Sequence, residues 1–203
     1  MPSMFVRNAF PSILFLSTAC YAQFPLSIGI KGGVALTQDI QNTTGTVGAG
    51  LAVTAYSTSK DYIIGPMLDL RLPFRLGVEA DALYRPFNIR EYTSAPSIVA
   101  PDYSGAYGSW EFPVVAKYRF SFPIVKPYVD AGPSFRTTKA QPLRRISSDG
   151  FALGAGLDFH LVFLHLEPEI RYTHWAGDGA PTFATAFIRS NQNQAEFLVG
   201  LAF

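Results

Sequence analysis

Apolar and polar residues alternate with a period of two in eight stretches of the chain after residue 25. Successive residues of a β-strand point to opposite faces of a sheet, so this alternation predicts strands with one apolar face. The predicted strands are residues 26–36, 61–72, 75–85, 108–120, 127–136, 150–160, 164–175 and 195–203. Helical periodicity is weak throughout, and the sequence therefore predicts an all-β protein.

The charged residues of the predicted strands follow the same period. Within each strand they all lie in one row, and the opposite row carries no charge. Leaving aside Arg75, which is expected at a turn, ten of these residues are acidic and seven are basic. They are Lys31, Asp61, Asp69, Arg71, Glu79, Asp81, Arg85, Glu111, Lys117, Arg119, Asp130, Arg136, Asp158, Glu167, Glu169, Arg171 and Glu196. A period of two alone does not distinguish a soluble barrel from an outer-membrane barrel, whose exterior is apolar and whose interior is polar.

The lengths of the connections favour the outer-membrane barrel. Short and long connections alternate strictly along the chain, as the periplasmic turns and extracellular loops of such barrels do. The short ones are residues 73–74, 121–126 and 161–163, and the long ones are 37–60, 86–107, 137–149 and 176–194. The apolar segment 47–56 is expected to extend the first hairpin beyond the membrane.

Aromatic residues of the apolar row gather at both ends of the predicted strands. Near the long loops are Tyr62, Tyr84, Trp110, Phe135, Phe151 and Tyr172, and near the short turns are Phe120, Phe159 and Phe203. Two such belts are typical of the two bilayer interfaces. The sequence thus predicts an eight-stranded antiparallel up-and-down transmembrane β-barrel with a polar lumen and an apolar exterior. Eight strands leave little room for water, so the charges of the inner row should form a network of ion pairs and hydrogen bonds.

Composition narrows the function classes. The chain has 203 residues, of which 48% are hydrophobic, 14% aromatic and 15% charged, with a net charge of +1. The balanced charge excludes a strongly basic nucleic-acid-binding protein. One Cys cannot form an internal disulfide or a CxxC site, and we expect no cofactor.

The first residues are typical of a secretory signal peptide, so we divide the chain into a signal peptide, 1–22, and a barrel domain, 23–203. Arg7 supplies the positive charge, residues 13–16 are apolar, and small residues precede the expected cleavage after Ala22. An alternative is lipoprotein processing at Cys20. Export through a signal peptide, together with the barrel pattern, predicts a location in the outer membrane.

Several runs resemble the bacterial outer-membrane β-barrel family of small OmpA/OmpX-like barrels. They are residues 30–34 (IKGGV), 72–84 (LPFRLGVEADALY), 110–113 (WEFP), 127–133 (PYVDAGP) and 169–172 (EIRY). The resemblance implies an architecture rather than an activity. The C-terminal residues Phe197, Val199, Leu201 and Phe203 resemble the assembly signal of this family, although Leu198 stands where a Gly is usual. This implies the barrel assembly machinery as a partner during insertion.

Candidate chemistry is sparse, and we expect a protein that is not an enzyme. Some eight-stranded barrels are lipid A deacylases that use a His and a Ser two residues apart. Here the residue two positions after His174 is Ala176, which has no hydroxyl group. Ser190 lies in the following loop, at a distance from His174 in the sequence that matches no known motif. His160 and His165 flank a turn without a clear third ligand, so no metal site is predicted.

The function expected from the sequence is a structural or surface-interaction role, with the long loops as the contact surface. The alternatives are a narrow porin-like channel and an outer-membrane lipid-modifying enzyme of the deacylase type. The expected surroundings are outer-membrane lipid, including lipopolysaccharide, whose phosphates Lys139, Arg144 and Arg145 could meet. We expect a monomer and no nucleic-acid partner.

Overall fold

The computed structural model describes residues 25–47, 51–59, 62–94, 103–138, 147–161, 164–177 and 189–203. The predicted signal peptide, Asp61 and the three basic residues of the third long loop lie outside these residues. No helix in the described ranges is long and apolar enough to cross a membrane.

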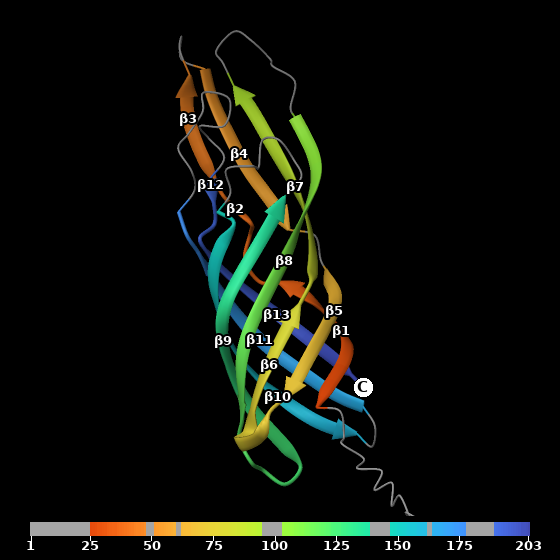
Figure 1. The fold of residues 1–203 in the computed structure, drawn as a ribbon. Helices are drawn as coiled ribbons and strands as arrows, with labels where there is room; N and C mark the ends of the chain where they lie inside the picture. The colour runs from red at the N-terminus through yellow and green to blue at the C-terminus, as the bar shows by residue number, and fades with distance from the viewer. Residues whose placement is uncertain are drawn as a thin grey trace, which may run out of the picture.

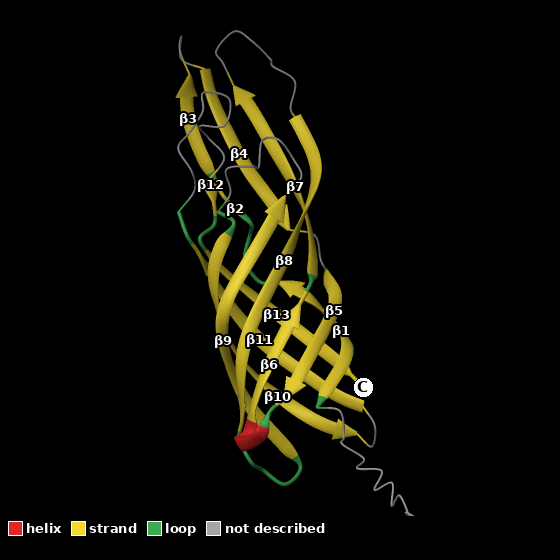
Figure 2. Cartoon of the chain, in the orientation of Figure 1, coloured by secondary structure: helices red, strands yellow, loops and turns green. Residues whose placement is uncertain are grey.

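The described chain is almost entirely β-structure (Figures 1 and 2). The strands are β1 (Leu26–Ala35), β2 (Ile40–Gln41), β3 (Thr43–Val47), β4 (Leu51–Ser59), β5 (Ile63–Arg71), β6 (Leu76–Asp81), β7 (Leu83–Ser94), β8 (Tyr103–Arg119), β9 (Val125–Thr138), β10 (Asp149–Leu161), β11 (Leu164–Trp175), β12 (Arg189–Ser190) and β13 (Asn193–Ala202). A short 3-10 turn, η1 (Pro73–Arg75), joins β5 to β6.

The sheet closes on itself. Strand β1 pairs antiparallel with the last strand, β13, with Lys31 opposite Gly200, and on its other side with β5, with Lys31 opposite Gly65. From β5 the ring continues through β6 and β7, β8, β9, β10 and β11 to β13, and every pair is antiparallel. Strands β6 and β7 form one strand of the ring, interrupted at Ala82. The predicted eight-stranded antiparallel barrel is confirmed.

The two rows of each strand face opposite sides of the barrel wall, as predicted. In β8, Lys117 is fully buried whereas its neighbour Tyr118 is 37% exposed. The same alternation runs through β5, β11 and β13. Of the predicted inner charges that the structure describes, all are buried except Arg71, whose side chain is 32% exposed. The polar lumen and the apolar exterior are therefore confirmed.

Several strands are longer than predicted. We expected a strand to end at residue 85 and the next to begin at 108, but β7 runs to Ser94 and β8 begins at Tyr103. Together with β3 and β4 they form a sheet that projects beyond the ring at one end (Figure 1). Here the alternation is inverted, because Asn88 and Arg90 lie in the outer row and the apolar residues Phe87 and Ile89 are buried in the inner row.

The opposite end of the barrel carries the short turns and the C-terminus (Figure 1). In η1 the backbone N–H of Leu76 donates to the carbonyl of Pro73, which closes a tight turn. The two residues between them, Phe74 and Arg75, have φ of 63° and 70°. Such left-handed values are common for Gly and Asn but costly for residues with larger side chains.

Candidate functional site

The inner row forms the candidate site, and its centre is organised around Glu79. Lys31 on β1 and Lys117 on β8 each donate to one oxygen of the Glu79 carboxylate. Lys31 also lies 2.9 Å from Glu169 Oε2, and Lys117 lies 2.8 Å from Glu167 Oε2. All five side chains are fully buried or nearly so. Four different strands thus meet at one ion-pair cluster in the middle of the barrel.

Arg171 on β11 completes this central cluster. Its Nη2 donates to Glu79 Oε1 at 2.9 Å, its Nη1 to Asp81 Oδ2 at 2.8 Å, and its Nε to Glu169 Oε1 at 2.6 Å. A guanidinium offers five N–H donors in a fixed plane, and here three of its nitrogens reach carboxylates on both sides of the lumen. Side chains therefore fill the cross-section at this level.

Gly154 on β10 provides the space that the central cluster needs. A Cβ at this position would lie 2.5 Å from Asp130 Oδ1 and 2.8 Å from Glu169 Oε1. Asp130 itself is buried, and neither of its oxygens accepts a hydrogen bond from the described residues. The structure thus places Asp130 beside the predicted network without a hydrogen bond to it.

A second cluster occupies the short-turn end of the lumen. Arg119 donates through Nη2 to Asp69 Oδ2 and lies 3.4 Å from Glu167 Oε1. Arg71 lies 3.3 Å from the same Asp69 oxygen through its Nε. Asp158 is 3.4 Å from Arg119 Nε. Two guanidinium groups and three carboxylates therefore share this level.

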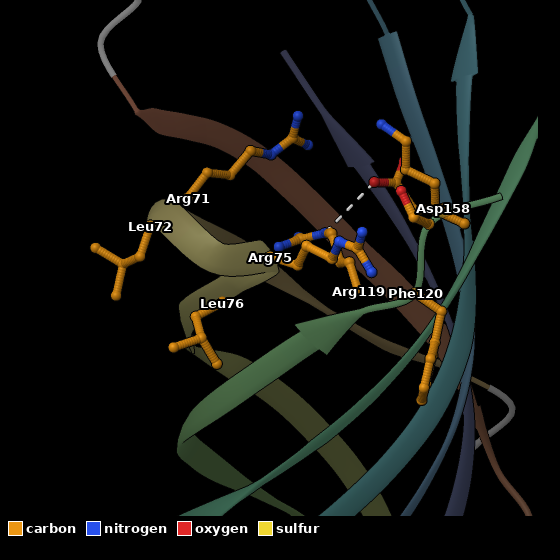
Figure 3. Close-up of a pocket in the computed structure, with 9 residues that line it drawn as sticks. Arg71, Leu72, Arg75, Leu76, Arg119, Phe120 and Asp158 are labelled. Atoms are coloured by element: carbon orange, nitrogen blue, oxygen red, sulfur yellow. Dashed lines mark ion pairs between the residues drawn. The ribbon is translucent and has the colours of Figure 1, made fainter. Parts of the chain in front are cut away.

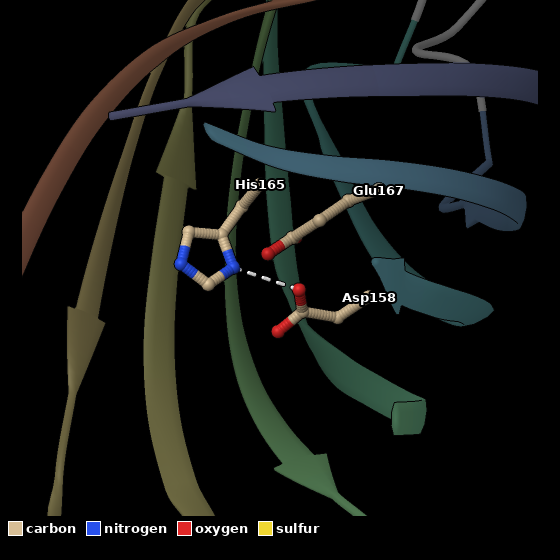
Figure 4. A group of neighbouring side chains, drawn as sticks. All are labelled: Asp158, His165 and Glu167. Carbon is tan, nitrogen blue, oxygen red and sulfur yellow. Dashed lines mark hydrogen bonds and ion pairs between the residues drawn. The ribbon is translucent and has the colours of Figure 1, made fainter. Parts of the chain in front are cut away.

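His165 belongs to this second cluster, although the sequence placed it only beside a turn. Its Nε2 lies 3.0 Å from Arg71 Nη1, and its Nδ1 lies 2.8 Å from Asp158 Oδ1 (Figure 4). Arginine only donates, so Nε2 accepts and Nδ1 carries the hydrogen that Asp158 accepts. The ring is thus held as the neutral Nδ1–H tautomer. Its position in the same row as Glu167 was the signal that the sequence offered.

Asp158, His165 and Glu167 are the only three potential metal ligands that gather within 4.8 Å of one another in the described residues (Figure 4). The chemistry around them does not suit a cation. Arg71 occupies the free lone pair of His165, and Arg119 lies within 3.4 Å of both carboxylates. We therefore interpret the three side chains as partners of the two guanidinium groups.

A third cluster lies at the long-loop end, around Arg85 on β7. Arg85 forms ion pairs with Glu196 on β13 and with Asp39, which lies between β1 and β2, both at 2.5 Å. Glu111 is 3.9 Å away. Asp39 was not predicted to reach the lumen, because it falls in the first long connection, where no strand pattern fixes a direction.

Short segments of the first and fourth long loops meet over this third cluster. Strand β2 pairs with β12, and the backbone N–H of Asn191 donates to the carbonyl of Asp39 at 2.9 Å. Ser190 accepts a hydrogen bond from Arg136 Nη2 at 3.2 Å. Arg136 also lies over the ring of the buried Trp175, 4.1 Å from its centroid. We call the paired β2 and β12 segments the loop strap.

The residues considered for deacylase chemistry are separated by the barrel wall. His174 faces the exterior and its Nδ1 lies 2.8 Å from Asn193 Oδ1, an amide oxygen that also accepts from Tyr172. Ser190, by contrast, is buried on the lumen side beside Arg136. The two side chains therefore do not form a His–Ser pair.

Comparison with known proteins supports the fold. No protein-family model matches the chain, and no curated protein matches it. Among solved structures, the crystal structure of Neisserial surface protein A is similar, with a TM-score of 0.52 and 14% identity over 88% of this chain and 96% of that one. This neighbour is an eight-stranded outer-membrane barrel, and the predicted OmpA/OmpX-like architecture is confirmed.

A second match is weaker. The transport unit of the autotransporter AIDA-I from Escherichia coli has a TM-score of 0.32 and 10% identity, covering 94% of each chain.

Proposed function

We propose that this chain is an outer-membrane β-barrel protein with a structural or surface-interaction role. The observation that carries the proposal is the inversion of polarity across the wall. Buried charges fill the inside, while large apolar side chains such as Ile30, Leu68 and Ile170 are 44–60% exposed on the outside. A continuous apolar exterior of this kind is stable in hydrocarbon and a liability in water.

The aromatic belts support a membrane position. Trp110, Phe135 and Phe151 are exposed near the long-loop end, and Phe120 and Phe203 near the short-turn end. Between the belts the outer row of the described strands carries no charged side chain. By the usual orientation of such barrels, the short turns face the periplasm and the long loops face outward.

The clusters of the lumen favour a structural role over the alternative of a narrow channel. Ions would have to displace the paired side chains at three levels, and breaking a buried pair costs about 3–5 kcal/mol. We therefore expect no stable channels in planar bilayers. Channels in the nanosiemens range would favour the porin-like alternative.

The sheet of β3, β4, β7 and β8 is the proposed contact surface. It projects beyond the ring on the side of the long loops, where recognition residues of rigid scaffolds concentrate. Lipopolysaccharide surrounds this end in the proposed orientation. We assign no catalytic role, in keeping with the separation of His174 and Ser190.

Fractionation tests the proposal directly. The protein should co-purify with outer membranes, and its folded form should migrate differently from the heated form on gels. Protease added to intact cells should cleave within the long loops and spare the strands. Recovery of a water-soluble monomer without detergent would contradict the proposal.

A further inference from the structure

The short-turn end of the barrel holds a cavity of about 200 Å³ that the structural role does not use. Its polar lining comes from Arg71, Arg75, Arg119, Lys126 and Asp158, so four cations face it and one carboxylate (Figure 3). Apolar side chains of the outer wall complete it, namely Leu72, Leu76 and Phe120. The cavity therefore joins a lining rich in cations, two of which are paired with Asp69, to an apolar rim.

The deeper cations have donors to spare. Arg71 Nη2 and Arg119 Nε are buried, and neither makes a hydrogen bond within the described residues. Their nearest carboxylate oxygens are 3.9 Å and 3.4 Å away, as ion pairs only. Buried donors without hydrogen bonds are uncommon in proteins and indicate a water or ion that completes them.

Unlike Arg71 and Arg119, the outer cations form no ion pair within the described residues. Neither Arg75 nor Lys126 contacts a carboxylate in the ranges that the structure describes. Arg75 is moreover one of the two left-handed residues of η1. Strained backbone of this kind concentrates at ligand-binding sites, where the cost is offset by placing a side chain. In η1 the strain places Arg75 at the cavity.

The surroundings indicate a ligand with an apolar part. Phe74 in η1 is 88% exposed, and Phe122 and Ile124 in the neighbouring turn are 56% and 83% exposed. In the proposed orientation these side chains lie at the inner interface of the membrane, at the depth of lipid headgroups. Arginine binds phosphate oxygens through paired N–H donors better than other side chains do.

We propose that this cavity binds the phosphate of an anionic phospholipid, with the acyl chains lying against Leu72, Leu76 and Phe120. The inference rests on the proposed membrane orientation. Arg71 and Arg119 supply the inner donors, while Arg75 and Lys126 neutralise the charge from the rim. The site takes one lipid from the periplasmic leaflet.

Binding is measured on the full chain in detergent micelles, by native mass spectrometry and by melting temperature. Phosphatidylglycerol should bind at one per barrel and raise the melting temperature, whereas phosphatidylcholine and inorganic phosphate should have little effect. The double variant Arg75→Gln/Lys126→Gln should lose affinity by about tenfold or more, equivalent to about 1.4 kcal/mol, because it removes both cations of the rim. The matched control is Arg90→Gln, which removes an exposed cation at the opposite end.

Three results would overturn the inference. One is equal affinity of the double variant and the unchanged protein for phosphatidylglycerol. Another is an equal loss in the Arg90→Gln control, which would indicate non-specific charge attraction. The third is an equal melting shift with inorganic phosphate alone, which would replace the lipid by a free anion. Lipid binding is measured in detergent, whereas the outer-membrane location is measured by fractionation. The lipid site and the proposed location can therefore fail independently of each other.

Discussion

Glu79 and Arg171 lie 92 residues apart in the sequence and meet in the middle of the lumen, with Arg171 Nη2 2.9 Å from Glu79 Oε1. Glu79 also accepts from Lys31 and Lys117, so one carboxylate contacts three buried cations. These cations share Asp81, Glu167 and Glu169 as further partners. The stability of the barrel should therefore be sensitive to this position.

Glu79→Leu should destabilise the barrel by about 3–5 kcal/mol, because it removes the shared carboxylate of a buried network and leaves an excess of positive charge there. Thermal unfolding in detergent, followed by the gel shift of the folded form, measures the loss. Asp149→Leu is the matched control, since Asp149 is an exposed carboxylate on the same ring. Equal melting temperatures for the two variants would argue against a stabilising network.

Gly154→Ala should also destabilise the protein, by about 1–3 kcal/mol, because the added methyl meets the Asp130 and Glu169 carboxylates. Gly32→Ala provides the comparison, because a Cβ there has its nearest neighbour at 3.7 Å. The free energy of unfolding, measured with urea in detergent, should be clearly lower for Gly154→Ala than for Gly32→Ala. The reverse order would mean that the central cluster is loosely packed.

Arg75→Gly should stabilise the protein while weakening the lipid site. The substitution removes a left-handed side-chain conformation that costs about 1–2 kcal/mol, and part of the gain is offset by the greater freedom of Gly in the unfolded chain. The melting temperature without lipid should rise, and the affinity for phosphatidylglycerol should fall. A lower melting temperature would show that Arg75 contributes to the fold itself.

Removal of Phe203 should reduce insertion into the outer membrane. The side chains of Phe197, Leu201 and Phe203 are 40–68% exposed on the outer face of the last strand. The amount of heat-modifiable protein in outer-membrane fractions measures insertion. Phe122→Ala, an exposed aromatic at the same end, should leave it unchanged. Normal insertion of the shortened chain would exclude the signal role.

The ring itself could be predicted from the sequence because a bilayer and a charged lumen impose opposite demands on successive residues. Every strand between the aromatic belts carries that alternation. It predicts how many strands the ring has and which row of each strand points into the lumen. The projecting parts of β7 and β8 could not be predicted in the same way. In this region Phe87 and Ile89 are buried in the inner row while Asn88 lies in the outer row, so the polarity of the two rows is the reverse of that in the ring.

The ion-pair partners within the lumen were harder to predict than which residues point into it. Alternation assigns Arg85 to the inside but does not say that Asp39, in a connection without strand pattern, turns in to meet it. The loop strap has only two residues in each strand, too few for a period to show. His165 was missed because only formally charged residues were considered for the inner row, although a neutral ring can accept from Arg71 equally well.

The pairing of the first strand, β1, with the last strand, β13, closes the ring. Lys31 on β1 finds its acceptors on β6 and β11, on either side of that seam. Without the pairing of β1 with β13, Lys31 would keep Glu79 on one side but would not be held beside Glu169 on the other. Closure of the ring and completion of the central charge cluster are therefore one event, because the same pairing of β1 with β13 accomplishes both.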